Sequence, residues 1–257
     1  MPEPVIDILM YHSISAQAGA TSIAPDVFAA QMRAIARSGV PVVALDDLVS
    51  ARAGRTTLPP RAIILTFDDG YTDFAATAWP VIRDLGMPVT VFLPSGHVGG
   101  IESWRGHAEP PRPLMDWDTI ATLAAEGVDF GGHTVSHPDL TALSQGQRQD
   151  EIAQSHAKLS AQLGRPPRHF APPYGLSDAP IRQQIATLYQ SSCGTRLGQA
   201  NAQSDLFDLP RLEMFYYTDP RRWQAHLAGR GAPYLALRQG LRRARRLVLN
   251  PWGLSRK

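Results

Sequence analysis

The stretch "AIILTFDDGYTDF" (62–74) joins an apolar run to two adjacent carboxylates, Asp68 and Asp69, which are followed at once by a glycine. The apolar run is rich in β-branched and aromatic residues and predicts a strand buried on both faces, as strands of parallel sheets are. An Asp-Asp-Gly turn after such a strand is common and can be purely structural. Two like charges side by side also raise the question of what stabilises them, and the rest of the sequence offers an answer.

Short apolar runs of the same kind recur along the chain and alternate with amphipathic helical patterns. Strands are expected at 5–11, 40–45, 62–67, 88–93, 128–133, 168–173 and 191–195, and helices within 25–39, 71–86, 116–127, 147–164 and 179–190. Ser144 and Gln147 have the spacing of a capping box at the start of the fourth helix. Strands that alternate with helices over about seven units predict a parallel sheet. At this length we expect a (β/α) barrel, complete or incomplete, with an open doubly wound sheet as the alternative.

Charge and composition exclude several classes of protein. A formal net charge of +2 over 257 residues is too small for the chain as a whole to be a nucleic-acid partner. The single cysteine, Cys193, excludes an intramolecular disulfide. The first residues, "MPEPVIDILMYHSI", lack the basic and long apolar regions of a signal peptide, and no run is long enough to span a membrane. We therefore expect a soluble cytoplasmic protein; its oligomeric state is not indicated.

Two histidines follow another predicted strand, in "GGHTVSHPDL". His133 and His137 are four residues apart, which puts them on one face of a helix or on one rim of a sharp turn. Two solvated surface histidines would give the same pattern. In a barrel, however, the carboxyl ends of the strands meet, so that a carboxylate from a neighbouring strand can join them. Two imidazoles and one carboxylate form the open three-ligand site of catalytic zinc and similar divalent cations.

A cation at this place also explains the paired aspartates. If one carboxylate binds the cation, the charge repulsion between the two is relieved, and the other can stay ionised beside it. One aspartate would be a metal ligand and the other a general base.

Three motifs in a fixed order carry a family resemblance. "TFDDGY" (66–71), "HTVSH" (133–137) and "FAPPYG" (170–175) resemble the first three motifs of the polysaccharide deacetylases, the NodB homology domain or carbohydrate esterase family 4. The resemblance extends over residues 5 to 215, approximately. It implies a distorted (β/α)7 barrel that removes N-acetyl, less often O-acetyl, groups from sugars with a divalent metal. That metal is typically zinc, with cobalt, nickel or manganese as alternatives. We expect the catalytic domain within 1–230.

The resemblance also implies roles for individual residues. The metal ligands would be Asp69, His133 and His137. Asp68 would be the general base and take a proton from the water that attacks the acetyl carbonyl. The metal and the backbone N–H of Tyr174 would stabilise the oxyanion, with Pro173 holding that amide rigidly at the substrate site.

Two departures from the family pattern concern the acid–base residues. The third motif commonly has an arginine that orients the catalytic aspartate, where this chain has Ala171; that role falls to Arg211 in "LPRLEM" or to no residue. The late motif that supplies a general-acid histidine is also missing, since "LALRQ" ends in Gln239. His12 after the first strand is the first candidate for the acid and His97 the second. For each of these histidines an ordinary solvated or hydrogen-bonded role is the alternative.

The loop 95–113 is long and rich in Gly and Pro, as loops that form substrate walls often are. Trp104 is the expected sugar contact in this loop, since a tryptophan face suits the apolar side of a sugar ring, and His97 would also face the substrate.

The segment 231–257 is a basic amphipathic tail. Either it lies on an anionic membrane, which would favour an acetylated glycolipid or nascent glycan at the inner face, or its apolar side closes the barrel bottom. Two alternatives to a deacetylase stay open: a family member that binds glycan without catalysis, and a hydrolase of a non-sugar amide.

Overall fold

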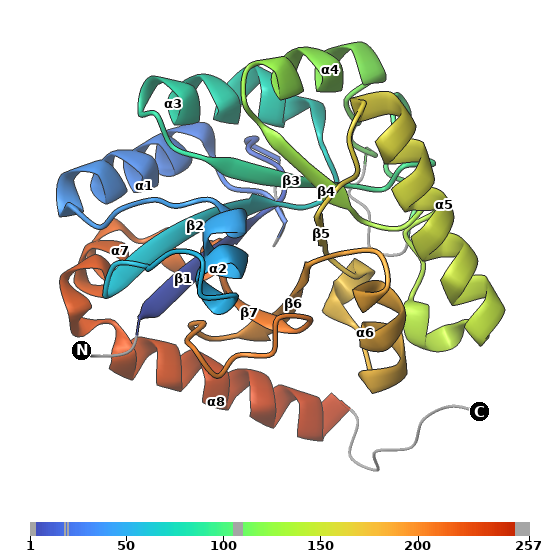
Figure 1. The fold of residues 1–257 in the computed structure, drawn as a ribbon. Helices are drawn as coiled ribbons and strands as arrows, with labels where there is room; N and C mark the ends of the chain where they lie inside the picture. The colour runs from blue at the N-terminus through green and yellow to red at the C-terminus, as the bar shows by residue number, and fades with distance from the viewer. Residues whose placement is uncertain (1–3, 18, 20, 105–109, 250–257) are drawn as a thin grey trace.

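Seven parallel strands close into a barrel in the computed structural model, which describes residues 4–17, 19, 21–104 and 110–249, with the backbone alone at 246–249 (Figure 1). The strands follow one another around the barrel in chain order, and the seventh pairs with the first. They are β1 (Val5–Tyr11), β2 (Arg61–Phe67), β3 (Val89–Leu93), β4 (Asp129–Gly132), β5 (His169–Phe170), β6 (Ser191–Leu197) and β7 (Leu209–Glu213). The expected (β/α)7 barrel is confirmed, and the open-sheet alternative is wrong.

One expected strand is wrong and one real strand was not expected. Residues 40–45 form only a bridge between Val42 and Ile63, because β3 starts level with Leu65 and leaves the edge of β2 at Ile63 to this segment. The chain then enters helix α2 (Leu45–Arg52). The missing strand is β7, in which a proline and two charged residues break the apolar pattern that strand prediction relies on.

Helices cover the outside of the barrel (Figure 1). In addition to α2 they are α1 (Pro25–Ser38), α3 (Trp79–Asp84), α4 (Trp117–Ala125), α5 (Gln145–Leu163), α6 (Ala179–Ala186), α7 (Pro220–Ala225) and α8 (Ala232–Leu249). Shorter helical turns are η1 (Phe74–Ala78), η2 (Leu140–Ala142), η3 (Pro173–Gly175), η4 (Met214–Tyr217) and η5 (His226–Arg230). The expected capping box is confirmed, because Ser144 and Gln147 exchange side-chain and backbone hydrogen bonds at the start of α5.

The alternation of side chains along each strand positions the site. Every second residue forms one buried apolar cluster, which includes Ile6, Ile8, Ala62, Ile64, Phe92, Ala171, Cys193 and Leu209. Continuing this alternation beyond the cluster leads to His12 after β1, to Asp68 after β2 and to Glu213 at the end of β7. Because the strands are parallel, these polar residues follow the apolar layer at the same end of the barrel.

Helix α8 forms most of the expected tail, whose last residues, 250–257, lie outside the described part. Gln239 donates to the Leu197 carbonyl and Arg242 to the Thr195 carbonyl, so α8 lies beside the carboxyl half of β6. The expectation that this segment closes the barrel bottom is therefore wrong. Among the helices described, none combines the length and the apolar character that crossing a bilayer requires.

Candidate active site

Asp69, His133 and His137 meet at the carboxyl end of the barrel. Asp69 Oδ1 lies 3.4 Å from Nε2 of His133 and 3.3 Å from Nε2 of His137, and all three side chains are buried. One ligand atom from each residue lies within 4.8 Å of the other two. The segment that contains the two histidines is a tight turn after β4, not a helix.

The polarity of these groups fits a cation between them. His133 Nδ1 is 2.6 Å from the carbonyl oxygen of Ala171, which can only accept, so this nitrogen carries a proton. In the neutral ring, Nε2 then presents a lone pair towards Asp69 Oδ1, which has no hydrogen-bond partner among the described residues. Acceptors that face one another in a buried place need a cation between them, and a second hydrogen bond that fixes the ring is typical of metal-binding histidines.

The backbone at this site is strained. Asp69, Thr134, His137 and Tyr174 have φ values of 74°, 67°, 57° and 59° and are the non-glycine residues with positive φ in the described part. Such conformations cost energy and persist where the surrounding structure enforces them, which is most often at functional sites. All four belong to the three motifs quoted above.

Arg211 takes the position of the orienting arginine. Its Nη1 and Nη2 donate to Oδ1 and Oδ2 of Asp68 at 2.7 Å each, while Nη1 also donates to Thr66 and Nε to the Gly194 carbonyl. Arg211 is 1% exposed and Asp68 4%. A forked contact of this kind fixes both position and orientation of the carboxylate. Ala171, where the family commonly has the arginine, is buried, and the guanidinium that contacts Asp68 comes from β7 instead.

Both aspartates stay ionised in this environment. Burial alone raises the pKa of Asp68, but the Arg211 guanidinium outweighs it and holds that pKa below its ordinary value. Burial also raises the pKa of Asp69, and protons carried on the His133 and His137 rings lower it well below the ordinary value; a cation held by the three residues would take the place of those protons. Asp68 is thus available to accept a proton next to the metal-type cluster.

His12 lies close to the carboxylate of Asp68. Its Nε2 is 3.9 Å from Asp68 Oδ2, and its side chain is 16% exposed at the mouth of the barrel. Glu213, whose strand partner is Met10, ends β7 on the same inward side as Arg211. Burial raises the pKa of Glu213, and the charge of His12 lowers it in part. The imidazole of His12 and the ionised carboxylate of Asp68 therefore lie near one another at the carboxyl end of the barrel.

The ring of His137 contacts three other rings, those of His133, Trp104 and Tyr174. Trp104 stacks on it with ring centroids 4.2 Å apart and an angle of 25°, and Tyr174 contacts it edge-on at 4.9 Å. His97 touches Trp104 at 5.3 Å and lies within 3.3 Å of the Ser136 carbonyl oxygen. The structure thus brings Trp104 and Tyr174 to the metal-type cluster, whereas His97 lies behind Trp104.

The turn that contains Tyr174 is tightly packed. Pro173 is buried, and Thr195 donates to the Tyr174 carbonyl at 3.2 Å. The next residue, Gly175, has φ 67°, and a Cβ there would lie 2.2 Å from Thr195 Oγ1. Only glycine fits, so β6 holds this turn against the site.

The loop that carries Trp104 is anchored by buried charges. Arg112 forms a forked ion pair with Glu102, at 2.8 and 2.9 Å, and donates to the Tyr71 hydroxyl at 2.7 Å. Tyr71 directly follows the Asp-Asp-Gly turn, so the loop is tied to the first motif. Residues 105–109 of this loop lie outside the described part.

Two supporting carboxylates were not expected from the sequence. Glu151 on α5 accepts hydrogen bonds from the backbone of Val135 and Ser136 and from the Ser136 hydroxyl, and so holds the turn between the two histidines. Asp73 accepts from Ser13 Oγ and the Ile14 N–H, and so holds the turn after His12. Asp73 is the third carboxylate of the stretch 62–74, so its place next to the first motif could have marked it as part of the site. Glu151 lies among other polar residues of α5, and no sequence pattern distinguishes it.

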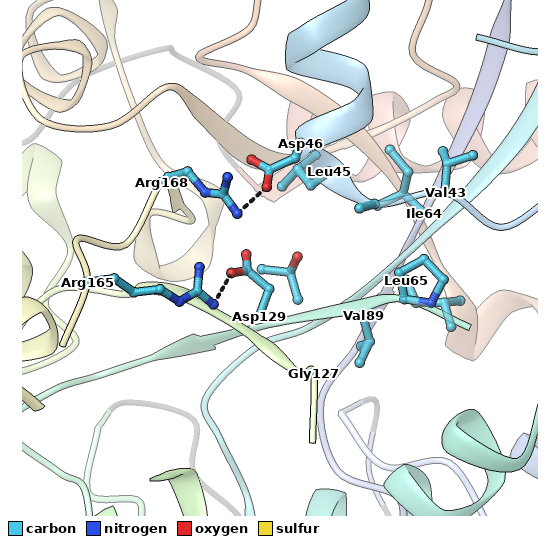
Figure 2. Close-up of a pocket in the computed structure, with 13 residues that line it drawn as sticks. Val43, Leu45, Asp46, Ile64, Leu65, Val89, Gly127, Asp129, Arg165 and Arg168 are labelled. Carbon is cyan, nitrogen blue, oxygen red and sulfur yellow. Dashed lines mark hydrogen bonds and ion pairs between the residues drawn. The ribbon is translucent and has the colours of Figure 1, made fainter. Parts of the chain in front are cut away.

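A cavity lies near the amino-terminal ends of the strands, at the end of the barrel opposite to the candidate active site. It has a volume of about 210 Å³ and lies by the first residues of β3 and β4, with Leu65 and Val89 in its wall (Figure 2). The charges around it are paired, Arg165 with Asp129 at 2.9 Å and Arg168 with Asp46 (Figure 2). Because the cavity lies at the amino-terminal ends of β3 and β4, it is separate from the site at their carboxyl ends.

The barrel, the buried Asp-His-His cluster and the oriented aspartate define a class of carbohydrate-processing hydrolases. The sequence profile of the family "Polysaccharide deacetylase" matches residues 55–190, more than half of the chain, and the chain belongs to this family. The expected enzyme class, a polysaccharide deacetylase-like hydrolase acting on non-peptide carbon–nitrogen bonds, is confirmed by this membership.

Individual relatives agree with the family. Putative polysaccharide deacetylase YxkH of Bacillus subtilis (strain 168) is 24% identical over 210 residues, 81% of this chain and 71% of YxkH. A chitooligosaccharide deacetylase of Bradyrhizobium sp. (strain ANU 289) is 31% identical over 118 residues, 45% of this chain and 47% of its own. The match thus spans less than half of this second relative.

Solved structures share the fold. Streptococcus pyogenes deacetylase PplD, determined in complex with acetate, has a TM-score of 0.72 and 25% identity over 82% of this chain and 92% of PplD. IcaB from Ammonifex degensii has a TM-score of 0.74 at 24% identity, over 90% of this chain and 98% of IcaB, which shows the same fold.

Proposed function

We propose that this protein removes N-acetyl groups from the sugars of a polysaccharide or glycoconjugate, with a divalent cation, zinc in the first place, held by Asp69, His133 and His137. The observation that carries the proposal is the forked contact between Arg211 and Asp68, next to that cluster. A protein that only binds glycan has no need of an oriented, buried, ionised carboxylate beside a metal site.

Asp69, His133 and His137 would hold the cation. A divalent cation there would supply Lewis-acid polarisation of an acetyl carbonyl and would make a water more acidic. His133 is fixed for this purpose by the Ala171 carbonyl, and the turn before His137 is fixed by Glu151.

Side chains of the protein are proposed to accept and donate the protons of the reaction. Asp68, ionised and held by Arg211, accepts a proton from the water that attacks the acetyl carbon. The leaving amine needs a proton in return, and His12, at 3.9 Å from Asp68, is the donor we propose. The Tyr174 backbone N–H, in the turn fixed by Thr195, is proposed to donate to the oxyanion.

The sugar is proposed to bind in front of Trp104. The Trp104 ring stacks on His137 and thereby forms part of the wall next to the cation site. An indole face in this position suits the apolar side of a sugar ring. Acetylated glycans or glycolipids are therefore the substrates we propose, in line with the chitooligosaccharide substrate in the name of the Bradyrhizobium relative.

The test is acetate release from a panel of substrates. Wild-type protein loaded with zinc or cobalt is incubated with N-acetylated oligosaccharides, an O-acetylated polysaccharide and small acetamides, and its metal content is determined. We expect acetate from N-acetylated oligosaccharides and a loss of about 10³-fold in Asp68→Asn with its metal retained. Release from small acetamides alone would replace the proposal with a non-sugar amidase. No release from any substrate by metal-loaded protein would indicate a glycan-binding protein.

A further inference from the structure

Helix α8 concentrates positive charge. Residues 232–249 include five arginines and no acidic residue, although the formal net charge of the whole chain is only +2. The active site does not use these arginines. Such local accumulation on an otherwise balanced protein indicates an anionic partner at this surface.

Two of the arginines help to hold the helix on the barrel. Arg238 covers the Tyr216 ring at 3.7 Å, and Arg242 donates to the Thr195 carbonyl at 3.2 Å. Leu235 is buried on the same side, and Gln239 donates to the Leu197 carbonyl. One face of α8 is therefore fully engaged with the barrel, and its orientation is fixed.

The other face of α8 exposes leucines. Leu237 and Leu241 are 57% and 52% exposed, and with Ile101 at 54% they are the most exposed large apolar side chains in the described part of the chain. With about 100° of rotation per residue, Leu237, Leu241 and the exposed Ala244 lie within about 60° of arc. Exposed Arg245 lies about 40° from one edge of this stripe, and exposed Arg243 lies about 100° from the other edge.

This arrangement matches the requirements of a membrane surface. Helices that lie in the bilayer interface have an apolar stripe that enters the acyl boundary and flanking basic residues that reach the phosphates. Each Arg or Lys near an anionic surface adds about 1 kcal/mol of attraction. An apolar stripe beside basic residues, with no acidic residue on the helix, fits an anionic lipid surface, whereas phosphate contacts to a nucleic acid do not require exposed leucines.

We propose that the outward face of α8, with Leu237, Leu241, Arg243 and Arg245, binds the surface of an anionic lipid bilayer. Because α8 lies beside Thr195, which also holds the Tyr174 turn, the bound membrane lies near the mouth of the barrel. If the proposed function holds, the accessible substrate is then an acetylated glycan carried on that membrane. The docking itself does not depend on the deacetylase activity.

The test is co-sedimentation of the full-length protein with vesicles. We expect binding to phosphatidylcholine vesicles that contain phosphatidylglycerol, and binding at least about tenfold weaker to phosphatidylcholine alone or in high salt. Leu237→Gln with Leu241→Gln, and Arg243→Gln with Arg245→Gln, are each expected to weaken binding by about tenfold or more. Circular dichroism verifies that both double variants are folded.

Matched substitutions elsewhere serve as controls. Leu188→Gln removes a leucine that is 40% exposed after α6, and Arg33→Gln with Arg37→Gln removes two exposed arginines of α1. These should leave vesicle binding unchanged. Failure of the wild type to bind anionic vesicles at low salt would overturn the proposal. Equal binding by the wild type and the α8 variants would also overturn it. So would self-association that depends on the leucines, or binding of duplex DNA, if either occurred in place of vesicle binding. Acetate release from a soluble oligosaccharide, measured on the same variants, distinguishes a failed docking surface from a failed enzyme.

Discussion

Arg211 holds both carboxylate oxygens of Asp68, at 2.7 Å each, although the two residues are 143 positions apart in the chain. They come from β7 and β2, which are not neighbours, because β1 lies between them. The guanidinium therefore reaches across the inside of the barrel to the base. The orientation of the base depends on closure of the whole barrel, not on a local turn.

Replacement of Arg211 by lysine tests this orientation. Lysine keeps the charge but cannot hold two oxygens and the Gly194 carbonyl at once. We expect kcat in Arg211→Lys to fall by about 10- to 100-fold, with KM and metal content close to wild type. Steady-state kinetics and metal analysis check this. Arg196→Lys, an exposed arginine of β6, is the control; a change in KM alone would contradict an orienting role.

Glu151 should influence the metal site through the backbone. Its carboxylate accepts from two N–H groups and one hydroxyl of the turn between His133 and His137. In Glu151→Gln we expect metal affinity to fall by about tenfold or more, because outer groups that orient ligands carry that much affinity. Competition with a chelator measures it. The exposed neighbour Asp150→Asn should have wild-type affinity, and equal affinity in both variants would show that Glu151 does not act on the site.

His12 is tested by the leaving group. If His12 gives a proton to the departing amine, His12→Gln should lower kcat on an N-acetylated sugar by about 10²-fold or more. It should have little effect on p-nitrophenyl acetate, whose leaving group departs without a proton. Rates on both substrates give the result directly. An equal loss on both would mean that His12 only shapes the site around Asp68.

Trp104 should act on binding. Removal of its ring takes away a sugar platform beside His137. We expect Trp104→Ala to raise KM for oligosaccharides by about tenfold and to leave hydrolysis of p-nitrophenyl acetate nearly unchanged. Trp104→Phe, which keeps an aromatic face, should recover most of the affinity. An unchanged KM in Trp104→Ala would place the sugar elsewhere.

Asp7 ties the start of β1 to the helices outside the barrel. It is fully buried and bonded to Arg61 at 3.0 Å, to His226 at 3.0 Å and to Gln199 at 2.7 Å. Burial raises its pKa, but the hydrogen bond from His226, the Gln199 amide and the Arg61 charge together lower it below its ordinary value. Its contribution to stability is therefore complete above the unfolded pKa of about 3.9 and is lost as the pH falls through the lower folded value.

Asp7→Asn should consequently lower the free energy of unfolding by about 3 kcal/mol at neutral pH. The difference from wild type should shrink in acid, because wild-type Asp7 then takes up a proton. Urea unfolding at neutral pH and in acid compares the two. Asp84→Asn at an exposed position should change stability by less than about 1 kcal/mol, and a constant difference at every pH would contradict the assignment.

The barrel and the site residues in the three motifs could be predicted from the sequence because both depend on local signals. Apolar runs identify buried strands, and residues at strand ends are brought together by parallel topology whatever the details of packing. The segment 40–45 had the composition of a strand, but the edge of β2 open to it at Ile63 is too short for more than a bridge. Strand β7 lacked the apolar pattern because its Arg211 points into a polar part of the barrel.

Long-range partners were harder to predict. The choice between Arg211 and no residue as the partner of Asp68 depended on where β7 lies, which no local pattern contains. Glu151 is one of several polar residues in α5, and only the tertiary structure distinguishes it from its neighbours. For α8, the composition suggested a membrane surface or the barrel bottom, and only the tertiary structure shows which of its faces packs against the barrel.

The left-handed backbone at Asp69, Thr134, His137 and Tyr174 implies a trade-off between robustness and activity. Each such residue costs about 1 to 3 kcal/mol, a sizeable share of the 5 to 15 kcal/mol that stabilises a typical domain. Glycine at Asp69 or His137 would relieve the strain but would also remove a side chain of the metal-type cluster. Mutations that loosen the barrel elsewhere should then relax these turns before the chain unfolds, so that activity declines ahead of structure.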